Sequence, residues 1–277
     1  MNVKLLTHTP NPEAVIAAAA RLCYSNASID ELMLKSEDEE STKKYIDMLM
    51  SLGHESPIEH CTFTFGIEGI SRACSHQLVR HRIASYSQKS QRYVNETQFE
   101  YVIPEAIENN PDPLAKNIYN DTMAFLQWSY DTIRSALIET YVKDGMDEKS
   151  AAKKANEDAR MVLPNACCTS IVVTMNIRSL FNFFRHRCCN RAQWEIQAVA
   201  IEMWHQCMDI APNVFKYAGP DCVTKGKCSE GKMSCGKPVH LIYEVEERYP
   251  QVEDNRTPEE VLNDVMKYHA DAAGNDK

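Results

Sequence analysis

The sequence predicts an α+β fold with a mixed sheet and long helices. Two short segments, 61–67 and 169–175, are rich in β-branched residues and partly alternate apolar with other side chains, which is typical of strands. A segment with helical spacing follows each of them, and the longest helical pattern covers residues 114–142. We therefore expect strands that lead directly into helices.

The other expected elements follow along the chain. Residues 12–24 form a strong helical pattern with Pro12 near the first turn, and 39–52 repeats apolar residues at helical spacing. Residues 71–81 are expected to form a helix carrying Gln77, Arg80 and His81, followed by a loop to Ser90. Gly219-Pro220 opens a loop rich in Gly and Lys. The remaining expected helices are 147–161, one or two within 178–210, and 257–270.

Composition excludes several classes of protein. The chain has 277 residues, 44% of them hydrophobic, and a net charge of −9, so it is neither disordered nor generally basic. We expect no extended nucleic-acid surface, no membrane segment and no signal peptide, hence a cytoplasmic protein. The eleven cysteines, an odd number, are typical of reduced thiols rather than a disulfide framework.

Against this acidic background, the segment 80–92 concentrates three arginines, a histidine and three serines. Guanidinium groups bind phosphate and carboxylate bidentately, and serine hydroxyls can hydrogen-bond the same oxygens. The cluster therefore favours a phosphate-bearing ligand. A lone arginine would more often form a surface salt bridge, so the interpretation depends on several arginines acting together.

The order Arg80-His81-Arg82, seven residues and then Ser90 resembles the signature of the flavin-dependent thymidylate synthases. The resemblance covers residues 1–217 and also includes 54–60, Gln77, 90–93, Arg160, 176–183, Arg187 and 193–195. It implies an enzyme that uses FAD, reduced by NADPH, and methylenetetrahydrofolate to methylate dUMP, giving dTMP and tetrahydrofolate. It also implies a homotetramer with active sites between subunits.

By the same resemblance, Arg92 and Arg160 hold the nucleotide, and Gln77, Arg80 and Ser90 contact it. Arg187 would stabilise negative charge on the uracil ring, because a fixed cation beside the N3 and carbonyl edge favours the form whose C5 is nucleophilic. Arg187 and Ser90 are the candidate catalytic residues. A nucleophilic serine needs a positioned base, and the sequence shows none, so we assign Ser90 to orienting the nucleotide.

The resemblance also implies a flavin site without a Rossmann turn, and the chain contains no G-x-G-x-x-G. Arg191 stands where the family often has His, and Gln88-Lys89 replaces Glu-Leu in one familiar form of the loop. The expected FAD-contacting residues are His54, Ser56, Arg80, His81, Arg82, Gln88, Asn176, Arg178 and Asn182.

No metal is expected. His54 and His60 are six residues apart with Pro57 between them, which does not fit two ligands on successive helical turns. Cys167 and Cys168 are interpreted as core thiols rather than nucleophiles. For Cys222, Cys228 and Cys235, which have polar surroundings, unliganded thiols are favoured over a metal or redox site.

We expect residues 1–217 to form the catalytic domain and 218–277 to be an extension with a Cys-containing loop and a helix. Two other functions remain open. A nucleic-acid-binding module would use the arginines and aromatics, but it should be basic overall. A flavoprotein with another nucleotide substrate on the same scaffold is the stronger alternative.

Overall fold

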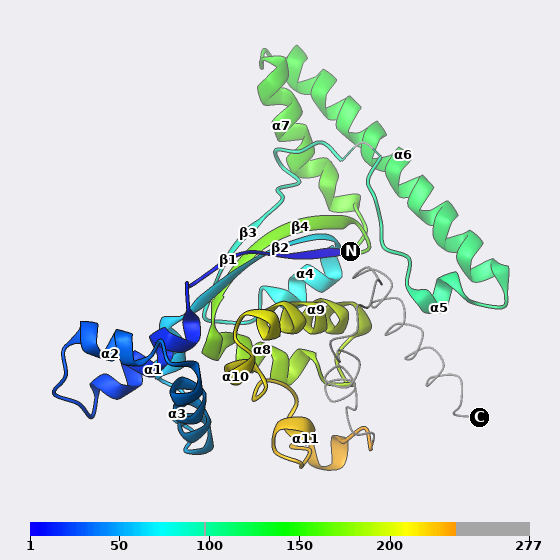
Figure 1. The fold of residues 1–277 in the computed structure, drawn as a ribbon. Coiled ribbons are helices and arrows are strands. Elements are labelled where there is room, and N and C mark those ends of the chain that lie inside the picture. The colour runs from blue at the N-terminus through cyan, green and yellow to red at the C-terminus, as the bar shows by residue number, and fades with distance from the viewer. Residues whose placement is uncertain (97, 237–277) are drawn as a thin grey trace, which may run out of the picture. The chain divides into compact units, whose positions relative to one another are not determined.

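The computed structural model describes residues 1–96 and 98–236 of the chain (Figure 1). Its strands are β1 (Asn2–His8), β2 (Thr62–Ser71), β3 (Ala84–Gln88) and β4 (Cys168–Asn176). Its α-helices are α1 (Pro12–Leu22), α2 (Ile29–Lys35), α3 (Glu39–Ser51), α4 (Arg72–Leu78), α5 (Glu105–Glu108), α6 (Pro113–Lys143), α7 (Glu148–Ala159), α8 (Ile177–Arg187), α9 (Trp194–Ile210), α10 (Pro212–Phe215) and α11 (Asp221–Thr224). Short 3-10 helices are η1 (Pro57–His60), η2 (Arg160–Val162) and η3 (Gly231–Met233).

These residues divide into two compact units. The first unit contains Met1–Asn2, Gly66–Arg80 and Tyr86–Val173. The second unit contains Val3–Phe65, His81–Ser85 and the described residues from Thr174 onward. The expected boundary between residues 217 and 218 is a different kind of division, and it stays a prediction.

The four strands form a sheet in the order β1-β2-β4-β3, and the sheet is antiparallel. At one end of the β2–β4 pair, the backbone N–H of Arg72 donates to the carbonyl of Cys167, and at the other the N–H of Ile177 donates to the carbonyl of Cys61, each at 3.0 Å. The α+β class is confirmed, but the expected mixed sheet is wrong. The alternation of apolar and polar residues shows which side chains face the core. It does not show whether the neighbouring strand runs parallel or antiparallel.

Both strand-to-helix junctions are fixed by side-chain caps. Ser71 ends β2, and its hydroxyl accepts a hydrogen bond from the backbone N–H of Cys74 at 3.0 Å. Asn176 ends β4, and its Oδ1 accepts from the N–H of Ser179 at 2.8 Å. Caps of this kind satisfy an otherwise unpaired amide of the first turn. The predicted sequence of strand then helix is therefore confirmed at both places.

In the first unit, α6 and α7 form an antiparallel helical pair (Figure 1). Both helices begin at an aspartate cap: Asp112 accepts from the N–H of Leu114, and Asp147 from that of Ser150. Only Met123 and Tyr130 of α6 are buried. Met123 packs with Phe99 and Cys167 in a small cluster. This long helix therefore contributes few residues to the core of its own chain.

The second unit has an aromatic core beneath α8. Phe63, Phe65, Phe183, Phe184 and Phe215 are all fully buried. The rings of Phe63 and Phe215 meet edge to face with centroids 5.3 Å apart, and those of Phe184 and Phe215 are 6.1 Å apart. Buried aromatic pairs add directional contacts to a large apolar burial. α8 is thus held firmly on one side, while its other side carries arginines.

The segment after β2 differs from the prediction. The helix α4 ends at Leu78, so Arg80 and His81 lie beyond it rather than on it. The expected loop to Ser90 contains the strand β3, which lies at an edge of the sheet. Its serine-rich sequence has little of the apolar alternation by which strands are recognised, because an edge strand is only half-covered.

The helices predicted at 12–24, 39–52, 114–142 and 147–161 are confirmed to within a few residues, and 178–210 contains two helices. The strand β1 and the helix α2 were not predicted. The helix expected at 257–270 lies outside the described residues. Within the described part of the chain, no helix is long and apolar enough to cross a membrane.

Candidate active site

Two arginines of the first unit meet at Glu157. The Nε atom of Arg92 lies 3.0 Å from Oε1 of Glu157, in an ion pair without hydrogen-bond geometry. The Nε–H of Arg160 donates to the main-chain carbonyl of Glu157 at 3.2 Å. The Arg92 and Glu157 side chains are 39% and 41% exposed, so water screens the pair strongly and an anion from solvent can compete for the guanidinium. The structure thus brings Arg92 and Arg160 to one place.

Ser90 lies beside this pair. Its Oγ accepts a hydrogen bond from the backbone N–H of Arg92 at 3.3 Å, which places a hydroxyl and a guanidinium on neighbouring residues of one turn. Gln77 is half-buried on α4, and Arg80 is exposed two residues after that helix ends. All of these residues belong to the first unit. They offer hydrogen-bond donors and positive charge, which suit a phosphorylated ligand.

Gln88 is turned into the first unit rather than toward an open surface. Its Nε2 donates to Oγ of Ser75 at 2.8 Å and to Oγ1 of Thr169 at 3.4 Å. This amide ties the end of β3 to α4 and β4. A structural role is therefore visible for Gln88, whose expected contact with the flavin stays a prediction.

A cavity of about 450 Å³ opens in the second unit. Its walls come from η1, the start of α8, residues 82–83 and the segment 217–225. Four of the residues expected to contact the flavin line it together: Arg82, Asn176, Arg178 and Asn182. His54 and Ser56 precede η1 and are exposed, but they are not among the lining residues. The cavity combines guanidinium groups with amides, a set that suits a polar ligand carrying negative charge.

Acidic side chains neutralise two of the cavity's arginines. The Nε of Arg178 lies 3.3 Å from Oε2 of Glu55, and its Nη1 donates to Oε1 of Glu59. Arg185 binds Asp221 through Nε at 3.1 Å and Nη2 at 2.6 Å. These contacts fix the guanidinium groups in place and lower the net positive charge of the wall.

Arg82 differs from those two arginines. It is exposed at the cavity, and among residues 1–96 and 98–236 it makes no ion pair. A cation that has no acidic partner keeps its full charge for an incoming anion. Arg82 is therefore the arginine of this wall that is best placed to attract one.

Arg187 and His81 form a second feature of the second unit. The Nε–H of Arg187 donates to Nε2 of His81 at 2.9 Å, and the imidazole meets the ring of Phe183 edge to face at 4.9 Å. Burial, and then electrostatic interaction with Arg187 and His186, lower the pKa of His81 to about 4. The imidazole is therefore neutral near pH 7 and can accept this hydrogen bond. His81 holds the guanidinium plane in one orientation.

Sequence reasoning missed the acidic partners of the arginines. Glu157 precedes Arg160 by three residues in one helical segment, and Glu55 and Glu59 are four apart on either side of Pro57. The first spacing places Glu157 and Arg160 close together on one helical segment, but it does not indicate the ion pair of Glu157 with the distant Arg92. The pairing of Glu55 and Glu59 with Arg178 joins residues more than a hundred positions apart, and no local pattern predicts that.

Cys167 is buried and packs with Phe99 and Met123, as expected for a core thiol. Burial raises its pKa to about 11, which makes it a poor nucleophile at neutral pH. Cys168 is half-buried. In the described part of the chain, no group of three or more His, Cys, Asp or Glu side chains is arranged to hold a metal ion.

Cys222 and Cys235 lie near the turn between α8 and α9. Arg191 in this turn binds Glu230 at 2.7 Å. Burial raises the pKa of the Cys189 thiol, and the neighbouring Cys235, Cys222 and Glu230 raise it further. The loop with Cys222 and Cys235 is therefore anchored by charge to the rest of its unit, although it has little apolar core of its own.

We expect the three loop cysteines to be dispensable for the chemistry. Substituting Cys222, Cys228 and Cys235 together by Ser should leave flavin content and product formation close to those of the unchanged protein. The reason is that the ion pairs of Arg185 and Arg191 hold this loop without the thiols. Flavin absorbance, activity and metal content should be measured on both proteins. Stoichiometric zinc or iron that is lost together with activity would contradict the expectation.

Comparison with known proteins identifies relatives over most of the chain. A family described as thymidylate synthase complementing protein matches residues 4–213. A protein of Clostridium tetani named flavin-dependent thymidylate synthase is 56% identical over 241 residues, which is 87% of this chain and 95% of that protein. Proteins with the same name from Geobacter sulfurreducens and Sulfurisphaera tokodaii are 49% and 39% identical, over 87% and 80% of this chain and 96% and 79% of theirs.

Proposed function

The chain belongs to the flavin-dependent thymidylate synthase family, and on that premise we propose how its residues serve the reaction. The reaction is the methylation of dUMP to dTMP, and the enzyme depends on a flavin. We propose FAD as that flavin, NADPH as its reductant and methylenetetrahydrofolate as the carbon donor. One observation supports this assignment of roles. The residues expected to bind the nucleotide lie together in the first unit, and four of those expected to bind the flavin line one cavity of the second unit.

Arg92 and Arg160 bind the phosphate of dUMP. Their convergence on Glu157 supports this, because Arg92 contacts the carboxylate and Arg160 the main-chain carbonyl of this one residue, which brings both guanidinium groups to the same part of the first unit. The exposed ion pair with Glu157 is weak, so a dianionic phosphate can replace the carboxylate. Gln77 and Arg80 of the same unit contact the nucleotide as well.

Ser90 orients the nucleotide by hydrogen bonding. Its Oγ already accepts from the N–H of Arg92, which leaves its O–H to donate to the ligand. No basic side chain hydrogen-bonds this hydroxyl in the described part of the chain, whereas a nucleophilic serine requires such a base. Ser90 therefore sets position and polarises the ligand rather than forming a bond to it.

The flavin fits the donor set of the second unit. Arg82, Arg178, Asn176 and Asn182 line a cavity of about 450 Å³, and Arg82 supplies a cation that has no acidic partner among the described residues. Guanidinium groups suit the pyrophosphate of FAD, and side-chain amides suit its ring edge. His54, Ser56 and His81 of the same unit, together with Arg80 and Gln88 of the first unit, complete the proposed set. When bound, the flavin supplies the hydride that completes the methyl group.

Arg187 acts on the uracil ring. A planar cation beside N3 and its neighbouring carbonyl stabilises the negative charge that develops when C5 becomes nucleophilic. The hydrogen bond from its Nε–H to the neutral His81 fixes the orientation of the guanidinium plane. Arg187 thus provides a positioned charge, and the chain needs no covalent nucleophile for this step.

We propose a homotetramer with active sites completed by neighbouring subunits. The helix α6 supports assembly, because Leu114, Ile118, Phe125 and Trp128 are 58%, 56%, 62% and 61% exposed. Their spacing places them on one face of the helix, and the ring centroids of Phe125 and Trp128 are 5.6 Å apart. Exposed apolar patches of this kind are typical of protein interfaces.

A test follows from the two substrates. The purified protein should be yellow, and its anaerobically reduced flavin should reoxidise only when dUMP and methylenetetrahydrofolate are both added. Absorbance near the flavin maximum and chromatography of dTMP measure the two halves of the reaction. If the reduced flavin is reoxidised equally well without dUMP, the result would favour the alternative, a flavoprotein with another substrate. A colourless protein that binds DNA or RNA would favour a nucleic-acid module.

A further inference from the structure

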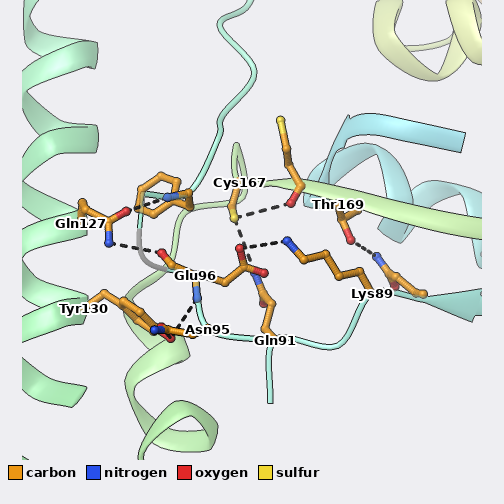
Figure 2. Close-up of polar contacts among 11 residues, drawn as sticks. Lys89, Gln91, Asn95, Glu96, Gln127, Tyr130, Cys167 and Thr169 are labelled. Carbon is orange, nitrogen blue, oxygen red and sulfur yellow. Dashed lines mark hydrogen bonds and ion pairs between the residues drawn. The ribbon is translucent and has the colours of Figure 1, made fainter. Parts of the chain in front are cut away.

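The loop 89–96 carries Ser90 and Arg92, and an ion pair joins its two ends. The Nζ atom of Lys89 lies 3.2 Å from Oε2 of Glu96 (Figure 2). The backbone N–H of Lys89 also donates to the carbonyl of Ser170 in β4 at 2.9 Å. The first residue of the loop is thus fixed to the sheet and to the last residue of the loop.

Glu96 is anchored from the opposite side by α6. Its backbone N–H donates to the hydroxyl of Tyr130 at 3.4 Å, and its carbonyl accepts from Nε2 of Gln127 at 3.2 Å (Figure 2). Tyr130 is fully buried, and Glu96 itself is only 5% exposed. The loop therefore spans from the sheet to the long helix, with the charged pair in between.

The pair is not a surface salt bridge. The Glu96 side chain is 6% exposed against 37% for Lys89, and its second oxygen, Oε1, has no hydrogen-bond partner in the described part of the chain. A buried carboxylate needs a nearby cation, since an uncompensated buried charge is strongly unfavourable. Lys89 supplies that cation, so neither residue can be neutralised alone without disturbing the loop.

The interior of the loop is hydrogen-bonded to itself. The backbone N–H groups of Tyr93 and Val94 donate to the carbonyl of Ser90 at 3.3 and 3.0 Å, and that of Arg92 donates to the Ser90 hydroxyl. Gln91 is buried, and its Nε2 donates to the sulfur of Cys167 at 3.6 Å. A shift at either end of this tight turn would be transmitted to Ser90 and Arg92.

We propose that Lys89 and Glu96 are positioning residues, whose ion pair, buried at its Glu96 end, holds Ser90 and Arg92 in the geometry that binds the phosphorylated nucleotide. This inference rests on the proposed function, because it takes the nucleotide to be the ligand of Ser90 and Arg92. Neither Lys89 nor Glu96 needs to touch the nucleotide. Lys89 belongs to the pair Gln88-Lys89, which replaces Glu-Leu of one familiar form of the loop. This lysine supplies the cation that the buried Glu96 carboxylate needs.

The test compares Lys89→Met, Glu96→Gln and the double variant in the full-length holoenzyme. Both substitutions remove the charge; Glu96→Gln keeps the length of the side chain, and Lys89→Met shortens it by one atom. Each single variant should raise the Kd and KM for dUMP by roughly tenfold to a hundredfold, the scale on which small misplacements act. Flavin content should fall much less than dUMP affinity, because four of the proposed flavin contacts line the cavity of the second unit, whereas Gln88 is the one that adjoins Lys89. The double variant should lose no more than the worse single variant, since it leaves no unpaired charge.

Two further variants sharpen the test. Lys116→Met removes another ion pair of the first unit, with Glu108, whose side chains are 39% and 43% exposed, and it should leave dUMP affinity unchanged. Lys89→Arg keeps the cation and should restore dUMP affinity close to that of the unchanged protein. It also tests the proposal if Lys89→Met fails to fold.

Three outcomes would overturn the proposal. Normal dUMP affinity in both single variants would show that the pair supports the fold alone. Losses that add fully in the double variant would show two independent roles. Weak dUMP binding by Lys89→Arg would show that the cation is not what matters. If the unchanged protein itself bound no dUMP, the proposed function would fail and this role with it, and that result is distinct from the other three.

Discussion

Replacing Arg187 by Lys should lower turnover by about 10²- to 10³-fold, the loss expected when one positioned donor to a developing charge is removed. The variant keeps the positive charge but loses the planar guanidinium and the Nε–H that His81 orients at 2.9 Å. An ammonium on a flexible stem is a poor substitute for such a group. Affinity for dUMP should fall much less, because Arg92 and Arg160 hold the phosphate.

Single-turnover kinetics and a dUMP titration would measure the two effects separately. Flavin absorbance in the same samples controls for the integrity of the second unit. His81→Asn is a useful companion, because it leaves Arg187 in place and removes the imidazole that orients it, so its loss should be smaller. Because His81 is also a proposed flavin contact, turnover of this variant is compared per bound flavin. Turnover of Arg187→Lys close to that of the unchanged protein would remove Arg187 from its assigned role.

The state of His81 matters for this experiment. Burial, Arg187 and His186 together lower the pKa of His81 to about 4, so the ring remains an uncharged acceptor across the neutral range. The unfolded chain would take up this proton nearer the ordinary histidine pKa of about 6.5. The stability that the neutral ring contributes is therefore present above pH 6.5 and declines as the pH falls toward 4. Kinetics at pH 7 and above avoid this complication.

Much of the fold follows from local patterns. The helices α1, α3, α6 and α7 have apolar residues at helical spacing, and the junctions at Ser71 and Asn176 combine a strand pattern with a capping side chain. The strand β3 and the antiparallel direction of the strands were not predicted from these patterns. An edge strand rich in serine has little alternation, and strand direction depends on contacts between distant segments.

The site shows the same division. The arginines were predicted because the family motif names them, whereas their acidic partners were not. Glu157, Glu55 and Glu59 decide how much charge the arginines of each unit keep for a ligand, and two of them act across more than a hundred residues. A pattern along the chain cannot show such pairing, because it depends on which segments fold together.

The distribution of the site residues over two units bears on assembly. Ser90, Arg92 and Arg160 belong to the first unit, and Arg187 belongs to the second. If neighbouring subunits complete each site, Arg187 of one subunit would serve the nucleotide held by Arg92 of another. Two inactive variants could then restore each other's function in a mixed oligomer.

We expect a mixture of Arg92→Ala and Arg187→Ala to regain activity after subunit exchange. Each variant retains the arginine that the other lacks, so a site is intact when each subunit contributes its undamaged residue. When the two variants are mixed in equal amounts, each of the two subunits that form a site contributes an intact arginine with a probability of one half. About a quarter of the sites should therefore contain both arginines. Turnover per site after exchange, with exchange proven by mass spectrometry, measures the recovery.

A mixture of Arg92→Ala and Arg160→Ala is the matched control. Both arginines contact Glu157 within one unit of one chain, so every site formed from this mixture lacks at least one of them and should stay inactive. Recovery in the control would show that Arg92 and Arg160 serve different sites. If exchange is proven and the first mixture still stays inactive, Arg92 and Arg187 must act from a single chain, and the proposal of shared sites must be abandoned.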